Sequence, residues 1–171
     1  MTIKKLAIIL NIFLVVNFAQ ATCYEQMEDN TPTIRYIFSD DGWVTDKKTN
    51  LMWMRCSLGQ TWENNTCTGQ EIYTFENSLI ISNEATFAGF DDWRLPNIKE
   101  LISIVANNCN RPAINLDAFP GTTDSIINSF WSATKTNDNS SAWSLDFAEG
   151  TPRVITVSAY YQVRLVRDLS N

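Results

Sequence analysis

Four cysteines constrain the fold of this 171-residue chain more than any other feature of its sequence; they are Cys23, Cys56, Cys67 and Cys109. An even number of cysteines in an exported chain predicts disulfides, and four cysteines allow three pairings. We favour a Cys56–Cys67 bridge, because the short stretch between these two residues contains glycine and asparagine residues typical of turns. Cys23 would then join the N-terminal arm to Cys109. A cysteine-ligated zinc site is the competing prediction, although the sequence has no CxxC pair.

The N-terminus predicts that the chain is exported. Lys4 and Lys5 precede an apolar run, and Ala19-Gln20-Ala21 has the small-x-small pattern that signal peptidase accepts. The run is shorter than the roughly 20 apolar residues that cross a bilayer. We therefore expect residues 1–21 to be a signal peptide, with no transmembrane segment after cleavage. A lipoprotein signal fits less well, because the residues before Cys23 do not match that pattern.

Composition argues against several classes of function. The formal charge of the whole chain is −6, and removing two lysines with the signal peptide lowers it to −8. An acidic surface repels phosphate backbones, so nucleic acid is not an expected partner. The chain has no histidine, which excludes Ser-His and Cys-His nucleophile pairs and every metal site that needs imidazole.

Residue patterns predict an α+β fold with two helices and a mainly antiparallel sheet. Residues 43–46 and 51–54 flank a turn and indicate a hairpin, and residues 74–85 indicate a helix with Thr74 as its N-cap. Further strands are expected in the second half of the chain, at residues 130–134, 143–148, 154–157 and 161–166. Alternation in these strands places Trp131 and Trp143 in the core.

The segment Phe90–Leu101 reads as a short strand that leads directly into a capped helix. Trp93 and Leu95 alternate with polar residues, and Asn97 with Glu100 three positions later is typical of a capping box. Neighbouring residues on a strand point to opposite faces. Asp91 and Asp92 are therefore badly placed to act together on one substrate, and we expect one of them to cap a turn or pair near Arg94.

Six segments in a fixed order resemble the Lcl C-terminal domain family, which is named for the C-terminal domain of a Legionella collagen-like adhesin. They are GWVTDKKTNLMWMRC, FAGFDDWRLPNIKEL, PAINLDAFP, FWSAT, AWSLDFAEG and YYQVRLVR. The resemblance implies a domain at residues 42–168, preceded by an N-terminal arm and first strand at residues 22–41. It also implies structural roles for the WRLP-x-x-x-EL motif, whose residues here are Trp93, Arg94, Leu95, Pro96, Glu100 and Leu101.

The resemblance further implies a C-type-lectin-like fold with long loops, stapled here by the disulfides. Family members usually lie outside the cell, so we expect a periplasmic, cell-surface or extracellular protein. The adhesin's domain is a trimer that binds sulfated glycans. The resemblance therefore implies a homo-oligomer, specifically a trimer, as one expectation for this chain. Sulfated-glycan binding does not carry over, because it needs a positive surface and this chain is acidic.

Candidate ligand contacts are few. Tyr160 and Tyr161 cannot both face inward on one strand, so one of them is expected near the surface, where it could stack on a sugar ring. No cofactor is expected. Calcium is the one candidate, because Ser39-Asp40-Asp41 and Asn137-Asp138-Asn139 are rich in oxygen ligands, but both read more simply as turns.

The favoured function is a secreted or surface-associated, non-enzymatic, adhesin-like binding module for a glycan or a surface protein. The first alternative is an enzyme of the formylglycine-generating type, which would need a free reactive thiol. A glycosidase is a weaker variant and would need two carboxylates facing one cleft. The second alternative is a structural subunit of a surface assembly.

Overall fold

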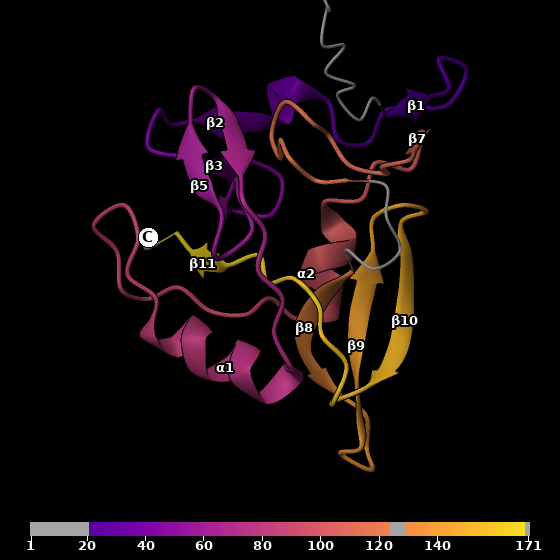
Figure 1. The fold of residues 1–171 in the computed structure, drawn as a ribbon. Helices are drawn as coiled ribbons and strands as arrows, with labels where there is room; N and C mark the ends of the chain where they lie inside the picture. The colour runs from indigo at the N-terminus through magenta and orange to yellow at the C-terminus, as the bar shows by residue number, and fades with distance from the viewer. Residues whose placement is uncertain (1–20, 124–128, 170–171) are drawn as a thin grey trace, which may run out of the picture.

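In residues 21–123 and 129–169, the chain forms two larger antiparallel sheets, two α-helices and two small two-stranded ladders (Figure 1). This computed structural model describes those residues, and the predicted signal peptide lies outside them apart from Ala21. The first elements are β1 (Thr22–Cys23), the 3-10 helix η1 (Thr33–Arg35), β2 (Tyr36–Phe38), β3 (Trp43–Asp46), β4 (Leu51–Met54), β5 (Thr61–Glu63), β6 (Thr66–Thr68) and α1 (Phe75–Glu84). The remaining elements are α2 (Ile98–Ser103), β7 (Cys109–Asn110), β8 (Phe130–Lys135), β9 (Ser141–Asp146), β10 (Thr151–Thr156) and β11 (Val166–Asp168). The α+β prediction is confirmed.

The four-stranded sheet has the order β11-β4-β3-β2 and is built on the predicted β3–β4 hairpin. Successive side chains on a strand point to opposite faces, so each strand contributes to both sides of the sheet. Val44 and Trp53 face one core, which also contains Phe119. Met52 faces a second core, which contains Trp93. The sheet therefore separates two apolar cores.

A buried ion pair lies beside the first core. The guanidinium of Arg35 donates from Nε to Asp46 at 2.6 Å and from Nη2 to the second carboxylate oxygen. Their side chains are 5% and 0% exposed. Burial alone would raise the pKa of Asp46, but hydrogen bonds from Arg35, Thr49 and the Lys48 amide lower the pKa below its usual value. Asp46 is thus held as a carboxylate inside the fold.

Both helices begin where the sequence predicts. The hydroxyl of Thr74 accepts from the Asn77 amide at the start of α1. At the start of α2, the side chain of Asn97 accepts from the Lys99 and Glu100 amides, and the Glu100 carboxylate accepts from the Asn97 amide at 2.7 Å. The predicted capping box is confirmed, and it satisfies amides that a helix start leaves without partners.

The three-stranded sheet has the order β10-β9-β8 and contains one correction to the predicted core. Trp131 is fully buried and packs edge-on against Phe75, as expected for a core residue. Trp143 is only partly buried, so its predicted place in the core is wrong. It lies opposite Val154 on β10, the outer strand of this sheet, and it is not among the buried residues that form either apolar core.

Two predicted strands are also wrong. Residues 91–96 form no strand and make only one isolated bridge, between Arg94 and Val166. Residues 163–165 form no strand either, and the expected exposed positions are buried: Gln162 is 4% exposed and Arg164 is 0% exposed. Structure covers this segment on both sides, which an alternating pattern in the sequence cannot reveal.

Arg164 is buried without an acid among its described contacts. Its Nη1 donates to the Met54 carbonyl at 3.0 Å and to the Arg55 carbonyl, and its Nη2 donates to the Thr122 hydroxyl at 2.9 Å. Two aromatic faces, Phe119 and Phe130, lie about its guanidinium at 4.8 and 5.1 Å. Burial lowers the pKa of Arg164 to about 9, so it is still charged at neutral pH.

The disulfides are Cys56–Cys67 and Cys23–Cys109, the pairing that the sequence favoured. Cys56–Cys67 ties the loop after β4 to β6. Cys23 lies directly opposite Cys109 in the β1–β7 ladder, so the second disulfide fixes the N-terminal arm to the body of the domain. No helix within the described ranges is long and apolar enough to cross a membrane.

Candidate functional site

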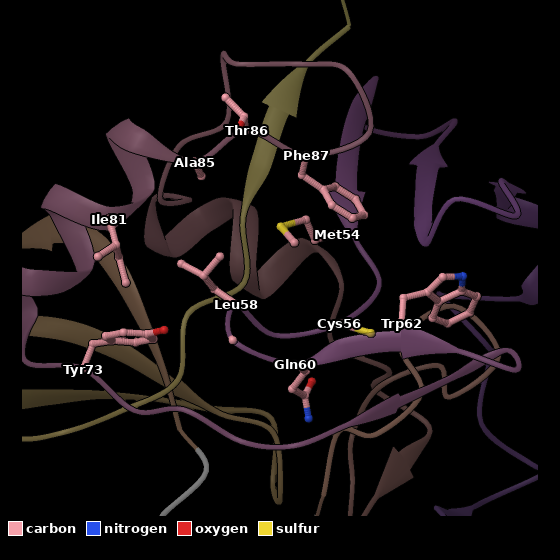
Figure 2. A pocket seen from close by; sticks show the side chains of 11 residues that line it. Met54, Cys56, Leu58, Gln60, Trp62, Tyr73, Ile81, Ala85, Thr86 and Phe87 are labelled. Carbon is pink, nitrogen blue, oxygen red and sulfur yellow. The ribbon is translucent and has the colours of Figure 1, made fainter.

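A cleft of about 400 Å³ opens between the C-terminal half of α1, the loop after β4 and the loop after α1 (Figure 2). Its surface is mostly apolar. Figure 2 shows Leu58 near its middle, Ile81 and Tyr73 on one side, and Met54 and Phe87 on the other. The full lining is Met54, Cys56, Leu58, Gly59, Gln60, Trp62, Tyr73, Ile81, Ala85, Thr86 and Phe87. Three separate stretches of chain, residues 54–62, Tyr73 and residues 81–87, therefore build one concave surface.

The polar groups of the cleft are mostly engaged within the protein. The Gln60 side chain accepts from the Ser57 amide at 2.8 Å and donates to the Gly69 carbonyl at 2.9 Å. The Tyr73 hydroxyl donates to the Glu71 carboxylate. Burial and this contact with Glu71 raise the pKa of Tyr73, so the hydroxyl is neutral at physiological pH. The cleft thus offers shape and apolar contact more than free hydrogen-bonding groups.

One wall of the cleft depends on the WRLP segment. The indole N–H of Trp93 donates to the Phe87 carbonyl at 3.0 Å, and the two rings lie 5.7 Å apart. Phe87 and Phe90 exchange backbone hydrogen bonds of 3.0 Å around a tight turn. Its central residues, Ala88 and Gly89, have φ values of 52° and 81°, as a type I′ turn requires. Trp93 therefore holds the loop that places the Phe87 ring at the cleft.

A second wall is fixed around Trp62. The indole N–H of Trp62 donates to the Asp40 carbonyl at 2.8 Å, and the guanidinium of Arg55 lies over its ring at 4.1 Å. Gly42 has φ of 84°, and a Cβ there would lie 2.7 Å from the indole. Glycine is required at this position both for the backbone conformation and for the close approach. The Cys56–Cys67 disulfide supports the same wall, since Cys67 lies opposite Trp62 in the β5–β6 ladder.

A comparison with protein families fits this architecture. The model of the Lcl C-terminal domain matches residues 42–167, which include every residue that lines the cleft. The chain belongs to the Lcl C-terminal domain family. No curated protein matches the chain. Membership indicates a surface-associated, adhesin-like module, and together with the two disulfides it indicates an exported protein.

The motif residues of this Lcl C-terminal domain hold separate segments together. Trp93, Leu95 and Leu101 are buried. The Arg94 guanidinium makes two hydrogen bonds of 2.9 Å to Glu100 and also pairs with Asp168 at 3.1 Å. The motif therefore connects α2 with the C-terminal strand β11.

The remaining motif positions and their neighbours also have structural contacts. Pro96 is buried, and its carbonyl accepts from the Ala133 amide of β8 at 2.7 Å. Asp92 pairs with Arg167, at 2.5 and 2.9 Å. Arg167 lies between Val166 and Asp168, and both of these residues contact Arg94. Arg167 in turn lies over the Phe90 ring at 3.9 Å. These contacts stabilise residues 90–96, which directly follow the turn that carries Phe87.

The structure does not bring Tyr160 and Tyr161 to the cleft. Tyr160 is 59% exposed, which places one of the two tyrosines at the surface as expected. Tyr161 packs edge-on against Trp131 at 5.1 Å, and its backbone exchanges hydrogen bonds with Tyr73. A ligand role for Tyr160 stays a prediction. The sequence did not predict the cleft, because no periodic pattern connects Leu58 with Phe87, which line it from separate segments.

The two candidate calcium loops form turns. The Asp138 carboxylate accepts from the Thr136 hydroxyl at 2.5 Å and from the Ser140 hydroxyl at 2.7 Å, and these contacts lower the pKa of Asp138. The Ser39 hydroxyl accepts from the Asp41 amide at 3.1 Å. Among the described residues, no group of three acidic, cysteine or histidine side chains is arranged to hold a metal ion.

Proposed function

We propose that this chain is a surface-associated, non-enzymatic binding module whose cleft recognises an apolar or aromatic side chain of a surface protein. The observation that carries the proposal is the chemistry of the cleft: aromatic and aliphatic walls around hydrogen-bonding groups that are already engaged. Ligand sites of this kind bind mainly by apolar contact. Sugars need several directed hydrogen bonds, so a glycan is the second candidate, favoured only by the aromatic rings that could stack on a sugar face.

Two observations support the non-enzymatic part of the proposal. All four cysteines are in disulfides, so the thiol that formylglycine-generating chemistry needs is not available. No carboxylate is among the residues that line the cleft, and glycoside hydrolysis needs two. We further propose that binding needs no metal ion.

The C-type-lectin-like fold belongs to the same proposal. Within the described residues, two α-helices, antiparallel pairing between all named strands and two disulfides support it. Outside the cytoplasm, the domain would present its cleft to partners on a cell surface or in the periplasm.

The test is a binding screen of residues 22–171 against a displayed peptide library and a glycan array, each with calcium and with chelator. Thr86 is exposed on the cleft rim, so Thr86→Arg would fill the mouth without disturbing the core. Asn83→Arg is the matched control, because Asn83 is an exposed α1 residue outside the lining.

We expect peptides with apolar or aromatic side chains to bind, and Thr86→Arg to weaken that binding at least about tenfold while Asn83→Arg does not. Binding to a glycan class alone would replace the surface protein with a sugar. Binding that Thr86→Arg leaves unchanged, or no binding by folded protein in either screen, would overturn the proposed role of the cleft.

A further inference from the structure

The two outer edges of the three-stranded sheet differ. The β8 edge is covered: the Trp131 amide donates to the Gln162 carbonyl at 3.0 Å, and the Ala133 amide donates to the Pro96 carbonyl at 2.7 Å. The β10 edge has no neighbouring strand among the described residues, and it lies at the margin of the molecule in Figure 1. Five of the six β10 residues are exposed. An open edge of this kind is a template for pairing with another strand.

The hydrogen bonds of β10 show which backbone groups the edge offers. The register pairs Thr156 with Ser141, and the next amide, Val157, donates to Ser140 at 3.2 Å. Residues alternate in antiparallel pairs between bonding the partner strand and pointing away from it. The backbone groups of Pro152, Val154 and Thr156 therefore point outward, away from β9.

Two of these outward positions are incomplete. Pro152 has no amide hydrogen to donate. The Thr156 carbonyl already accepts from the Ala159 amide at 3.0 Å. The groups left for a partner are the Pro152 carbonyl, the Val154 amide and carbonyl, and the Thr156 amide.

We propose that two copies of this chain pair antiparallel through β10, with Val154 opposite Val154 of the second copy. In this register Pro152 lies opposite Thr156 of the second copy. The Pro152 nitrogen, which has no hydrogen to donate, then faces the Thr156 carbonyl, which already accepts from the Ala159 amide. Every remaining outward group then finds a partner. The two Val154 residues exchange two hydrogen bonds, and each Thr156 amide donates to the Pro152 carbonyl across the interface. Only a two-fold arrangement centred on Val154 places the Pro152 nitrogen of each copy opposite the Thr156 carbonyl of the other.

Side chains support the same register. Trp143 lies directly opposite Val154 within the sheet, and both are accessible: Val154 is 47% exposed and Trp143 is partly buried. Pairing would align Trp143 and Val154 of one copy with Val154 and Trp143 of the other in one apolar row. The edge carries no lysine or acid that would oppose pairing, and its one charge, Arg153, is already bonded to Asp146 at 3.1 Å.

The interface is small and isologous, so we expect a weak dimer and not the trimer that the family resemblance implied. It is also separate from the cleft, because the β10 edge and the cleft share no residue. The dimer would present two clefts on one particle, which raises avidity for a partner on a surface.

A cross-link tests the register. The four native cysteines are all in disulfides, so Val154→Cys adds one free thiol. Directly opposed residues of a hydrogen-bonded antiparallel pair have Cα atoms about 5.5 Å apart, within the range of a disulfide. Thr156→Cys is the matched control: it lies on the same face of β10, but in the proposed register it faces Pro152 of the second copy.

We expect Val154→Cys to form a disulfide-linked dimer under mild oxidation, and Thr156→Cys to stay monomeric, as seen on a non-reducing gel. Equal cross-linking of both variants would show random collision and overturn the register. If Val154→Cys does not cross-link although a maleimide shows that its thiol is accessible, the pairing itself is overturned.

Analytical ultracentrifugation measures the self-association of the chain without a cross-link. Val154→Lys places two like charges opposite each other, and we expect it to weaken self-association of residues 22–171 at least about tenfold. Ile37→Lys is the matched control, since Ile37 is 53% exposed on β2, the edge strand of the other sheet. A trimer, a monomer at about millimolar concentration, or a dimer lost in Ile37→Lys and kept in Val154→Lys would each contradict the proposal.

Discussion

Replacing Asp46 with asparagine is the sharpest test of how the fold is held together. The substitution keeps the shape of the side chain and removes its charge, so Arg35 is left buried without a counterion. An asparagine amide would also direct N–H groups toward the guanidinium, which has only donors. Breaking a buried ion pair by removing one partner costs about 3–5 kcal/mol. That is a large part of the about 5–15 kcal/mol by which a domain is usually stable.

Urea unfolding of residues 22–171 with intact disulfides measures the cost. With a slope of about 2 kcal/mol/M, the midpoint should fall by about 1.5–2.5 M while the slope stays constant. Glu149→Gln is the control, because Glu149 and Arg111 are 43% and 62% exposed and 3.2 Å apart. An exposed pair of this kind contributes less than about 1 kcal/mol. A loss below about 1 kcal/mol in Asp46→Asn would refute the argument that this pair is essential.

Three further perturbations follow from particular contacts. The pKa of Asp46 is lowered in the folded state, so its contribution is present above about pH 4 and is lost as the pH falls through the folded pKa; urea midpoints between pH 6 and pH 2 should fall less in Asp46→Asn than in the parent. Ala88 has φ of 52°, so Ala88→Gly should raise the free energy of unfolding by about 0.5–1 kcal/mol, and an unchanged or lower value would contradict the strained turn. Replacing both Cys56 and Cys67 with serine should lower the free energy of unfolding by about 2–3 kcal/mol, and so lower the midpoint temperature of thermal unfolding. An unchanged midpoint would show that the bridge does not constrain the unfolded chain.

The sequence predicted the parts of the fold that depend on residues close together in the chain. The hairpin of residues 43–54, the Thr74 cap and the Asn97–Glu100 capping box each need only one turn of chain, so their signals are local. The choice of Cys56–Cys67 also rested on a short loop, and the pairing of Cys23 with Cys109 then followed by elimination.

Long-range packing decided the features that the sequence did not reveal. Asp92 pairs with Arg167, which lies 75 positions later in the chain, and no pattern near Asp92 indicates that partner. Arg164 occupies a position that alternation marks as exposed, yet segments from elsewhere in the chain surround it. Trp143 shows the opposite error, since an aromatic residue on a strand is usually in the core but here lies next to an open edge.

The candidate site was the least predictable part, for the same reason. Leu58, Ile81 and Phe87 come from a loop, a helix and a turn, and only the assembled fold places them around one cleft. The sequence did identify Trp93 as a structural residue. It could not show that Trp93 acts on the cleft through the Phe87 carbonyl.

Amide NMR spectra of residues 22–171 would test the central claim most directly. The two probes are N-acetylphenylalanine amide, which represents an aromatic side chain of a protein, and methyl β-glucoside, which represents a neutral sugar. We predict that the aromatic probe shifts amides around the cleft, at Leu58, Ile81 and Phe87, and that Thr86→Arg removes these shifts. Shifts confined to the exposed loop at Tyr160, or none at the cleft with either probe at about 10 mM, would contradict the claim that this cleft is the binding site.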